Sequence, residues 1–212
     1  MSRPKVKVCG MTRIEDIRLA LDLGADYIGM IVYPKSPRSV SAAQLRELLT
    51  YVPEGKRVRV DVETPTQDLE AARKLGFDFY QMHFSEDVSI ATIAAWSGLV
   101  GRDRLWAVPK IPPEQNAFPP EVLEFADTLL VDGYQPNLHG GTGKTTNWQR
   151  FQDWTLLHQH KNWILAGGLS PDNILQALEV THAKTIDLNS GVESSPGIKD
   201  PEKLKQAFAV LS

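Results

Sequence analysis

The stretch 6-VKVCG-10 sets the first unit of the fold. Its β-branched run favours a strand from Val6 to Cys9, and Gly10 then lets the chain turn. Cys9 is the single cysteine of the 212 residues. A thiol at the carboxyl end of a first parallel strand is a candidate reactive group. Free cysteine is also among the residues most often buried as a small hydrophobe, so the rest of the chain has to decide between the two roles.

Strand-like and helix-like segments alternate along the chain after this stretch. Residues 13–23 have the apolar periodicity of a helix, with Thr12 and Glu15 in the pattern of a capping box. The segment 109–120 holds five of the 14 prolines, so the fifth helix is expected to be short or missing. We expect strands at 6–9, 27–32, 57–62, 79–83, 105–108, 128–131, 163–166 and 185–188, and helices at 13–23, 41–51, 65–75, 89–96, 121–126, 148–157, 171–180 and 201–211.

The repeated order of strand then helix indicates an α/β fold. The strands are rich in Val, Ile and Leu, which is typical of a parallel sheet buried on both faces. Eight such units in about 200 residues predict one compact (β/α)8 TIM barrel over residues 1–212. The alternative is an open, doubly wound sheet. No linker or change in composition suggests a second domain.

The composition excludes several classes of partner. Apolar residues make up 42% and charged residues 23%, as in ordinary soluble domains. The net charge of −3 does not favour binding to nucleic acid. A single cysteine permits no internal disulfide. The first residues lack the apolar segment of a signal peptide, and no apolar run reaches the ~18 residues of a membrane helix. We therefore expect a cytoplasmic protein with no membrane or nucleic-acid partner.

The carboxyl ends of the strands are where a (β/α)8 barrel carries its active site. Loops after the seventh and eighth strands often bind phosphate, and glycines there let the backbone approach an anion, although turn glycines are common for other reasons. The candidates that the predicted strand ends present are Cys9, Arg38, Gln81, His83, Asp132, Gly167, Gly168, Asp187, Asn189, Ser190 and Gly191.

Several of these candidates have more than one interpretation. Asp132 ends an apolar run and suits either a loop or helix-cap position or a general acid. His83 is more often a core residue than a ligand, and no second histidine lies at a spacing typical of zinc. Arg38, in a loop stiffened by prolines, suits a bidentate hold on a carboxylate. The run GGTGKT at 140–145 is not a nucleotide P-loop, because Leu138 stands where that motif needs glycine.

Five stretches together resemble the phosphoribosylanthranilate isomerase family, the third-step isomerases of tryptophan biosynthesis. They keep the family's order nearly end to end. The resemblance implies a single (β/α)8 barrel, monomeric or dimeric, with a small phosphosugar substrate and neither a metal nor an organic cofactor. The stretches are VKVCGMTRIEDI, GADYIGMIVYPKSPRSVS, LLVDGYQPNLHGGTGKT, LAGGLSPDNI and IDLNSGVESSPGIKD.

The resemblance also implies roles for individual residues. Cys9 would be the general base and Asp132 the general acid of an Amadori rearrangement. That reaction converts N-(5-phosphoribosyl)anthranilate to 1-(o-carboxyphenylamino)-1-deoxyribulose 5-phosphate. Arg38 would hold the anthranilate carboxylate. The substrate-binding residues implied by the resemblance are Arg38, His83, Asp187, Gly141, Gly167, Gly168, Ser190 and Gly191.

Acid–base chemistry at neutral pH makes demands on both groups. The Asp132 carboxyl has to keep its proton, although a free aspartate has a pKa of about 3.9. The Cys9 thiol has to ionise below its ordinary pKa of about 8.5, so a cationic neighbour would help. Lys7 is expected to point to the opposite face of the strand and not to serve.

The chain departs from the family pattern at three places. Where the family usually reads VGVFVN, this chain reads VRVDVE at 58–63. Arg59 and Asp61 are expected to face the barrel interior and to pair with each other or with a site group. Phe84 replaces a glycine after the fourth strand, and Asn147 replaces an aspartate. These changes leave open a related phosphosugar isomerase or a non-catalytic phosphosugar-binding barrel.

Overall fold

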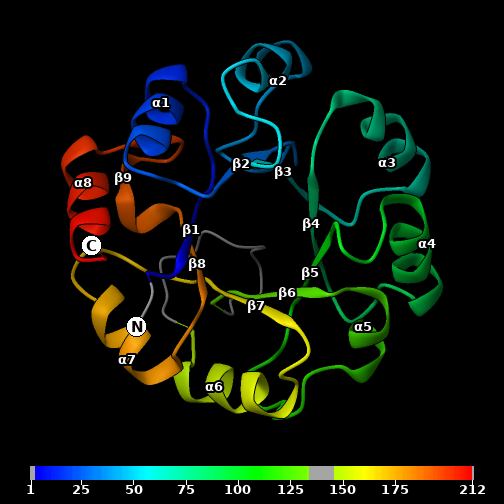
Figure 1. Cartoon of the computed structure of the whole chain (residues 1–212). Coiled ribbons are helices and arrows are strands. Elements are labelled where there is room, and N and C mark those ends of the chain that lie inside the picture. The colour runs from blue at the N-terminus through cyan, green and yellow to red at the C-terminus, as the bar shows by residue number, and fades with distance from the viewer. Residues whose placement is uncertain (1–2, 134–145, 212) are drawn as a thin grey trace.

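The computed structural model describes residues 3–133 and 146–211. Within these ranges eight parallel strands pair in chain order and close into a barrel. Closure comes from β1 (Lys5–Val8), which pairs with both β2 (Tyr27–Ile31) and β8 (Thr185–Leu188). Figure 1 shows the helices as an outer ring around this barrel. The predicted (β/α)8 fold is confirmed, and the open-sheet alternative is wrong.

The remaining elements follow the expected alternation. The fifth helix is short, as the prolines before it predict. The strands are β3 (Arg57–Val62), β4 (Phe79–Phe84), β5 (Leu105–Pro109), β6 (Thr128–Val131) and β7 (Asn162–Leu165), and the helices are α1 (Ile14–Asp22), α2 (Ala42–Leu49), α3 (Thr66–Ala72) with the 3-10 turn η1 (Arg73–Leu75), α4 (Ile90–Val100), α5 (Pro120–Phe125), α6 (Trp148–Leu157), α7 (Ile174–Thr181) and α8 (Pro201–Ala209).

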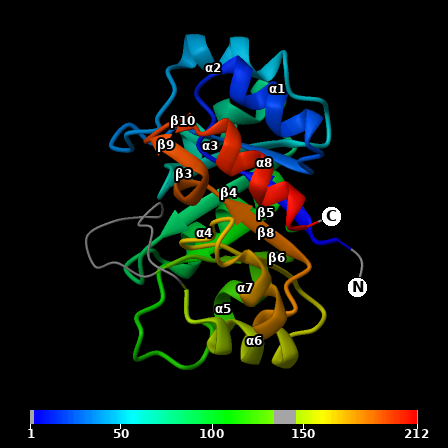
Figure 2. The same ribbon diagram turned by 90° about the vertical axis from the view of Figure 1, so that its left-hand side faces the viewer.

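A small hairpin lies between β8 and α8 and was not predicted. The 3-10 turn η2 (Ser190–Val192) leads into β9 (Glu193–Ser195), which pairs antiparallel with β10 (Ile198–Lys199). Figure 2, a side view, shows this hairpin on the opposite side of the molecule from the two chain ends. Strands this short carry too few alternating residues to give a sequence pattern.

Alternate residues of the barrel strands pack into two separate cores. One core lies between the strands and the helices and joins strand residues such as Met30 and Tyr80 to helix residues such as Ile17. The other lies inside the barrel and contains Cys9 and Trp106. Because both faces of each strand are buried, the strands read as nearly continuous apolar runs.

The charged residues of β3 face the helices and not the barrel interior. Arg59 pairs in register with Met30 and Tyr80, both of which belong to the outer core. The interior positions of β3 are held by Val58 and Val60 instead. The expectation of an inward-facing pair was therefore wrong. The side chains of a strand alternate between its two faces, and the prediction assigned Arg59 and Asp61 to the face that Val58 and Val60 occupy. The expected pairing is confirmed, with 2.7 Å between Arg59 Nη2 and Asp61 Oδ2.

Phe84 also packs on the outer side of the barrel. It is buried, and its ring lies 5.7 Å from that of Trp96 on α4. The change from glycine therefore fills the layer between barrel and helices and adds no bulk to the interior.

The capping contact expected of Thr12 is replaced by another contact. The cap of α1 is Arg13, without a side-chain cap bond, while Thr12 donates to the carbonyl of Gly197. The cap of α3 is Pro65. Ser41 caps α2 and forms a capping box there with Gln44.

Along residues 3–133 and 146–211, no helix has both the length and the hydropathy needed to cross a bilayer.

Candidate active site

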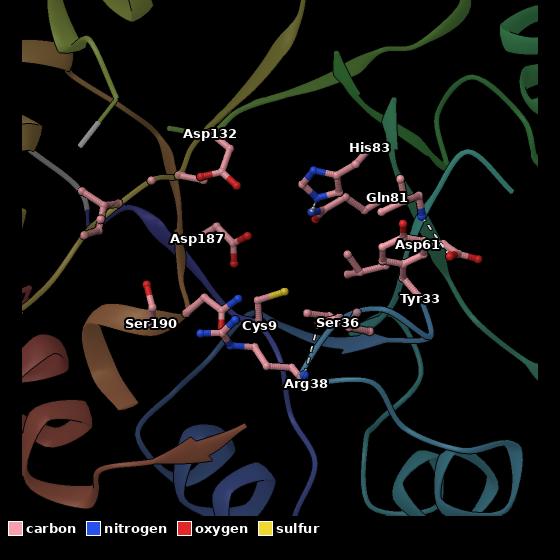
Figure 3. Close-up of a pocket in the computed structure, with 18 of the residues that line it drawn as sticks. Cys9, Tyr33, Ser36, Arg38, Asp61, Gln81, His83, Asp132, Asp187 and Ser190 are labelled. Atoms are coloured by element: carbon pink, nitrogen blue, oxygen red, sulfur yellow. Dashed lines mark hydrogen bonds between the residues drawn. The ribbon is translucent and has the colours of Figure 1, made fainter. Parts of the chain in front are cut away.

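A pocket opens at the carboxyl ends of the barrel strands, where the sequence predicts the site. The empty space between its walls, including the part open to solvent, is about 680 Å³. Figure 3 shows side chains from opposite walls pointing into this one cavity. The predicted site residues that line it are Cys9, Arg38, His83, Asp132, Gly167, Gly168, Asp187, Ser190 and Gly191. The remaining predicted residue, Gly141, lies outside the described residues.

Cys9 follows the last residue of β1 and is nearly fully buried. Its N–H donates to the carbonyl of Leu188, which continues the β1–β8 pairing past the end of the strand. Figure 3 shows its sulfur directed into the cavity. The thiol therefore lies between the apolar side chains inside the barrel and the open pocket. This position suits both a packing role and a reactive role.

Lys7 lies inside the barrel, two residues before Cys9, and is completely buried. Its Nζ is 2.8 Å from Asp187 Oδ2, so the two form an ion pair within the barrel. The expectation that Lys7 points away from Cys9 was wrong, because side chains two residues apart on a strand lie on the same face. The signal was present in the sequence, as the spacing of Lys7 and Cys9 alone gives the correct face.

Burial dominates the electrostatics of this interior group. It raises the pKa of the Cys9 thiol, and Asp187 raises it further, while Lys7 and Lys199 act in the opposite direction. The expectation of a thiol more acidic than usual is therefore wrong for the chain without a ligand. Burial also raises the pKa of the Asp187 carboxyl, against the effect of the Lys7 ammonium.

Asp132 comes directly after β6, across the cavity from Cys9 in Figure 3. Its Oδ1 accepts a hydrogen bond of 2.7 Å from the N–H of Gly133. It does not cap the following helix, since the side chain of Asn147 accepts from the Arg150 N–H at the start of α6. The replacement of aspartate by Asn147 thus keeps a capping residue, and the carboxyl of Asp132 points into the pocket.

Gln81 and His83 project inward from β4. The Gln81 amide nitrogen and the His83 Nε2 are 2.9 Å apart. Among the described residues, Gln81 Oε1 has no hydrogen-bond partner although it is buried. A buried acceptor without a partner is costly, so this amide is suited to a donor group on a ligand. The sequence predicted both residues at this strand end, and the resemblance implied a binding role only for His83.

Arg38 is buried, and its guanidinium binds the carboxylate of Glu193. Its Nε and Nη2 donate to both oxygens of Glu193 at 2.7 to 3.1 Å. Lys199 Nζ also donates to Glu193, at 3.0 Å. The predicted bidentate geometry is present, but toward a residue of the chain itself. A ligand carboxylate would use the Nη1 side of the fork, which Glu193 leaves open.

The loops after β7 and β8 meet at the rim of the pocket. A Cβ on Gly191 would lie 2.0 Å from the carbonyl oxygen of Leu169, so only glycine permits this approach. Asn173 stiffens the first loop by bonding to both Gly168 and Ser170. Backbone held this close to a cavity is the arrangement in which barrels of this type bind phosphate.

These features define the class of the protein. It is a (β/α)8-barrel enzyme whose strand-end pocket holds a thiol and a carboxyl on opposite walls, beside two glycine-bearing loops. Over residues 6–210 the sequence matches the family described as N-(5'phosphoribosyl)anthranilate (PRA) isomerase. The chain belongs to this family.

Individual relatives agree over almost the whole chain. The N-(5'-phosphoribosyl)anthranilate isomerase of Synechococcus elongatus is 37% identical, with 98% of this chain and 96% of the relative covered. The crystal structure of the Thermus thermophilus phosphoribosyl anthranilate isomerase superposes with a TM-score of 0.79 at 31% identity, covering 98% of both chains. A structure of monomers generated from the dimeric Thermotoga maritima enzyme gives a TM-score of 0.78 at 26% identity, covering 98% and 97%. Structures of the family thus include monomers and dimers.

Proposed function

We propose that this chain isomerises N-(5'-phosphoribosyl)anthranilate to 1-(o-carboxyphenylamino)-1-deoxyribulose 5-phosphate, a step of tryptophan biosynthesis. The observation that carries the proposal is the single pocket that gathers Cys9, Asp132 and the two phosphate-type loops. Family membership over residues 6–210 supports the same reaction. We take residues 1–212 as one barrel domain that acts in the cytoplasm as a monomer or homodimer.

Asp132 is the proposed general acid. Its carboxyl gives a proton to the ring oxygen of the ribose, the bond from C1 to that oxygen breaks, and the anilinic nitrogen forms a Schiff base with C1. A side chain at a strand end, projecting into the pocket, can reach a ring oxygen there. Deprotonated Asp132 can later recover its proton from solvent, so the residue returns to its starting state.

Cys9 is the proposed general base. Its thiolate removes the proton from C2, and the electron pair of that bond forms the C1–C2 double bond of an enolamine while the Schiff base nitrogen is neutralised. A proton from solvent then adds to C1 and the C2 hydroxyl loses its proton, which gives the ketose, and the Cys9 thiol releases the proton it took from C2 to solvent. The thiol acts on a proton only, and no covalent bond between sulfur and substrate is required.

The remaining pocket residues are proposed to orient the substrate. The loops carrying Gly167, Gly168, Ser190 and Gly191 would hold the 5'-phosphate, and Arg38 would hold the anthranilate carboxylate. His83 and Asp187 line the space between these two ends, where the ribose would lie. Gly141, which lies outside the described residues, stays a predicted substrate contact.

The alternative functions lose part of their motivation. Arg59 and Phe84, which suggested an altered pocket, both lie in the layer between barrel and helices. Asp61 remains at the rim of the pocket, and its carboxylate turns away from the cavity in Figure 3 toward Arg59 and Thr64. None of the three side chains therefore argues for a different substrate.

The test is turnover of N-(5'-phosphoribosyl)anthranilate by the purified chain, compared with phosphoribosyl amines that lack the anthranilate carboxylate. We expect conversion to the ketose product, with the analogues turned over far more slowly. Binding without turnover would support a non-catalytic barrel instead. Preferential turnover of an analogue would support a related isomerase. Arg102→Ala, at an exposed ion pair remote from the pocket, is the control and should keep full activity.

A further inference from the structure

We propose that Lys7 is a positioning residue for the proton transfer: its ammonium, fixed inside the barrel by Asp187, supplies the positive charge against which the Cys9 thiolate forms. The proposal rests on the role of Cys9 as the base in the function proposed above. Lys7 does not line the pocket and would act through Cys9, not on the substrate.

The geometry begins with the burial of Lys7. None of its surface is exposed, which is unusual for a lysine, because a buried charge needs a partner. Asp187 provides that partner with one oxygen, at 2.8 Å from Nζ. Its second oxygen, Oδ1, is buried without a partner within the described residues. An interior ion pair of this kind contributes little to stability compared with apolar packing, so another reason for its presence is needed.

Gly29 on β2 makes room for Lys7 and Cys9 to lie together. A Cβ at Gly29 would be 2.9 Å from Cys9 Sγ, 3.0 Å from Lys7 Cε and 3.1 Å from Lys7 Nζ. The sulfur and the ammonium nitrogen therefore flank the same empty point and are at most 6.0 Å apart, the sum of the first and last distances. An opposite charge this close favours the ionised thiol.

Other charged groups around Cys9 have partners elsewhere. Lys199 on β10 is held by Glu193 and Asn189, and Arg38 is held by Glu193. The acidic groups facing the pocket are Asp187 on β8 and Asp132 after β6, and His83 lies on β4. Within the described part of the chain, Lys7 is thus the cation that lies inside the barrel, next to Cys9 on the same strand.

The balance of charge supports this assignment. Burial alone would lower the pKa of Lys7, but Asp187 and Cys9 raise it above its ordinary value, so the ammonium persists. For the Cys9 thiol, Lys7 is the largest influence that lowers the pKa, while Asp187 raises it. Lys7 and Asp187 therefore act on the thiol with opposite signs, which gives the proposal a distinctive test.

The test uses the fact that Cys9 is the only cysteine of the chain. Protein labelled with 13C at the cysteine Cβ gives one signal whose shift reports the thiol pKa without any substrate. We expect Lys7→Met to raise that pKa by about one unit and Asp187→Asn to lower it. Lys7→Arg, which keeps the charge, should stay closer to the unmodified chain. Lys5→Met is the control, since Lys5 is exposed at the other end of β1 and should leave the pKa unchanged.

The outcomes separate an electrostatic role from a structural one. Loosening of the barrel would move both variants in the same direction, toward the ordinary thiol value, and would overturn the proposal, as would an unchanged pKa in Asp187→Asn. If Lys7→Met fails to fold, Lys7→Gln takes its place, because a raised thiol pKa in a variant without the ammonium is the result that loosening cannot give. The pH profile of turnover in Lys7→Met should shift to more alkaline pH by the same amount. Because the titration needs no substrate, absence of turnover would count against the proposed function and not against this charge arrangement.

Discussion

Gly29 shows how a missing side chain can shape a reactive centre. In the middle of a buried strand glycine is usually unfavourable, because it adds backbone entropy to the unfolded state and packs nothing. Here the space it leaves holds the Cys9 sulfur and the end of the Lys7 side chain. Gly29 therefore gives Cys9 and Lys7 their space and makes the β2 strand less stable.

Gly29→Ala tests that interpretation. The added methyl would lie 2.9 Å from Cys9 Sγ and 3.0 Å from Lys7 Cε, so both must shift. We expect a loss of about 1–3 kcal/mol in the free energy of unfolding, measured in urea, together with reduced turnover. The matched control is Gly98→Ala in α4, where a Cβ meets nothing within 4 Å. It should stabilise the chain by about 0.5–1 kcal/mol, and equal effects in the two variants would contradict the account.

Arg38→Lys tests the fork at the other end of the pocket. A lysine keeps the charge but cannot bind a carboxylate in the bidentate geometry that Arg38 uses toward Glu193. We expect the KM for phosphoribosylanthranilate to rise about tenfold, which corresponds to the loss of one charged hydrogen bond of about 1.5 kcal/mol. Steady-state kinetics measures this, and kcat should change less than KM. A fall in kcat alone would place Arg38 outside substrate binding.

The β9–β10 hairpin is the element that fixes one side of the site. Lys199 joins it to Asn189 through Nζ and to Asp16 at the start of α1 through its backbone N–H. Glu193 joins it to Arg38. This hairpin of five strand residues thus ties together the loops after β2 and β8 and the first helix.

Glu193→Gln tests this linking role. It leaves two buried cations without their carboxylate, so we expect the free energy of unfolding in urea to fall by about 3 kcal/mol at pH 7.

The same variant predicts a pH dependence. Burial opposes ionisation, but Arg38 and Lys199 hold the pKa of Glu193 below its ordinary 4.5. A carboxylate whose pKa is lower in the folded chain stabilises the fold at every pH above its ordinary pKa. This stability is lost as the pH falls through the pKa of the folded chain. The difference between variant and unmodified chain should therefore shrink below pH 4.5. Glu202→Gln, at an exposed pair, should cost less than about 0.5 kcal/mol, and a similar loss in both would refute the role.

Sequence patterns located the elements better than their ends and faces. The expected bounds of β3, β6, β8 and α6 match the structure, because each is a run of clear period between turn residues. The face of Lys7 was misassigned although alternation along one strand defines it. The hairpin and the contact of Thr12 depend on residues far away in the chain, so local pattern could not reveal them.

At the scale of the whole molecule, closure of the barrel brings the site together. Lys7 and Asp187 are 180 positions apart, and Arg38 and Glu193 are 155 apart. Five motifs resemble one family, and this resemblance predicted Cys9, Asp132 and the loop glycines as site residues. The predicted residues that the structure describes all lie around one pocket. The partners of Lys7 and Arg38 could not be read from the sequence, since only the folded barrel makes them neighbours.

A ligand that fits this pocket should stabilise the whole fold. With the product 1-(o-carboxyphenylamino)-1-deoxyribulose 5-phosphate at 100 times its Kd, linkage gives about 2.7 kcal/mol. For a chain of 212 residues this corresponds to a rise in Tm of about 5–10 °C by calorimetry. Inorganic phosphate, which can use only the loops after β7 and β8, should give a smaller rise. No change in Tm with the product would argue against the pocket as its binding site.

The central claim is that Cys9 and Asp132 are the base and the acid of one isomerisation, and turnover of N-(5'-phosphoribosyl)anthranilate by Cys9→Ala and Asp132→Asn tests it most directly. Removal of either group should lower kcat by at least about 100-fold, in the range that general acid–base catalysis contributes, while each variant still binds the product. Rates close to that of the unmodified chain in either variant would contradict the account.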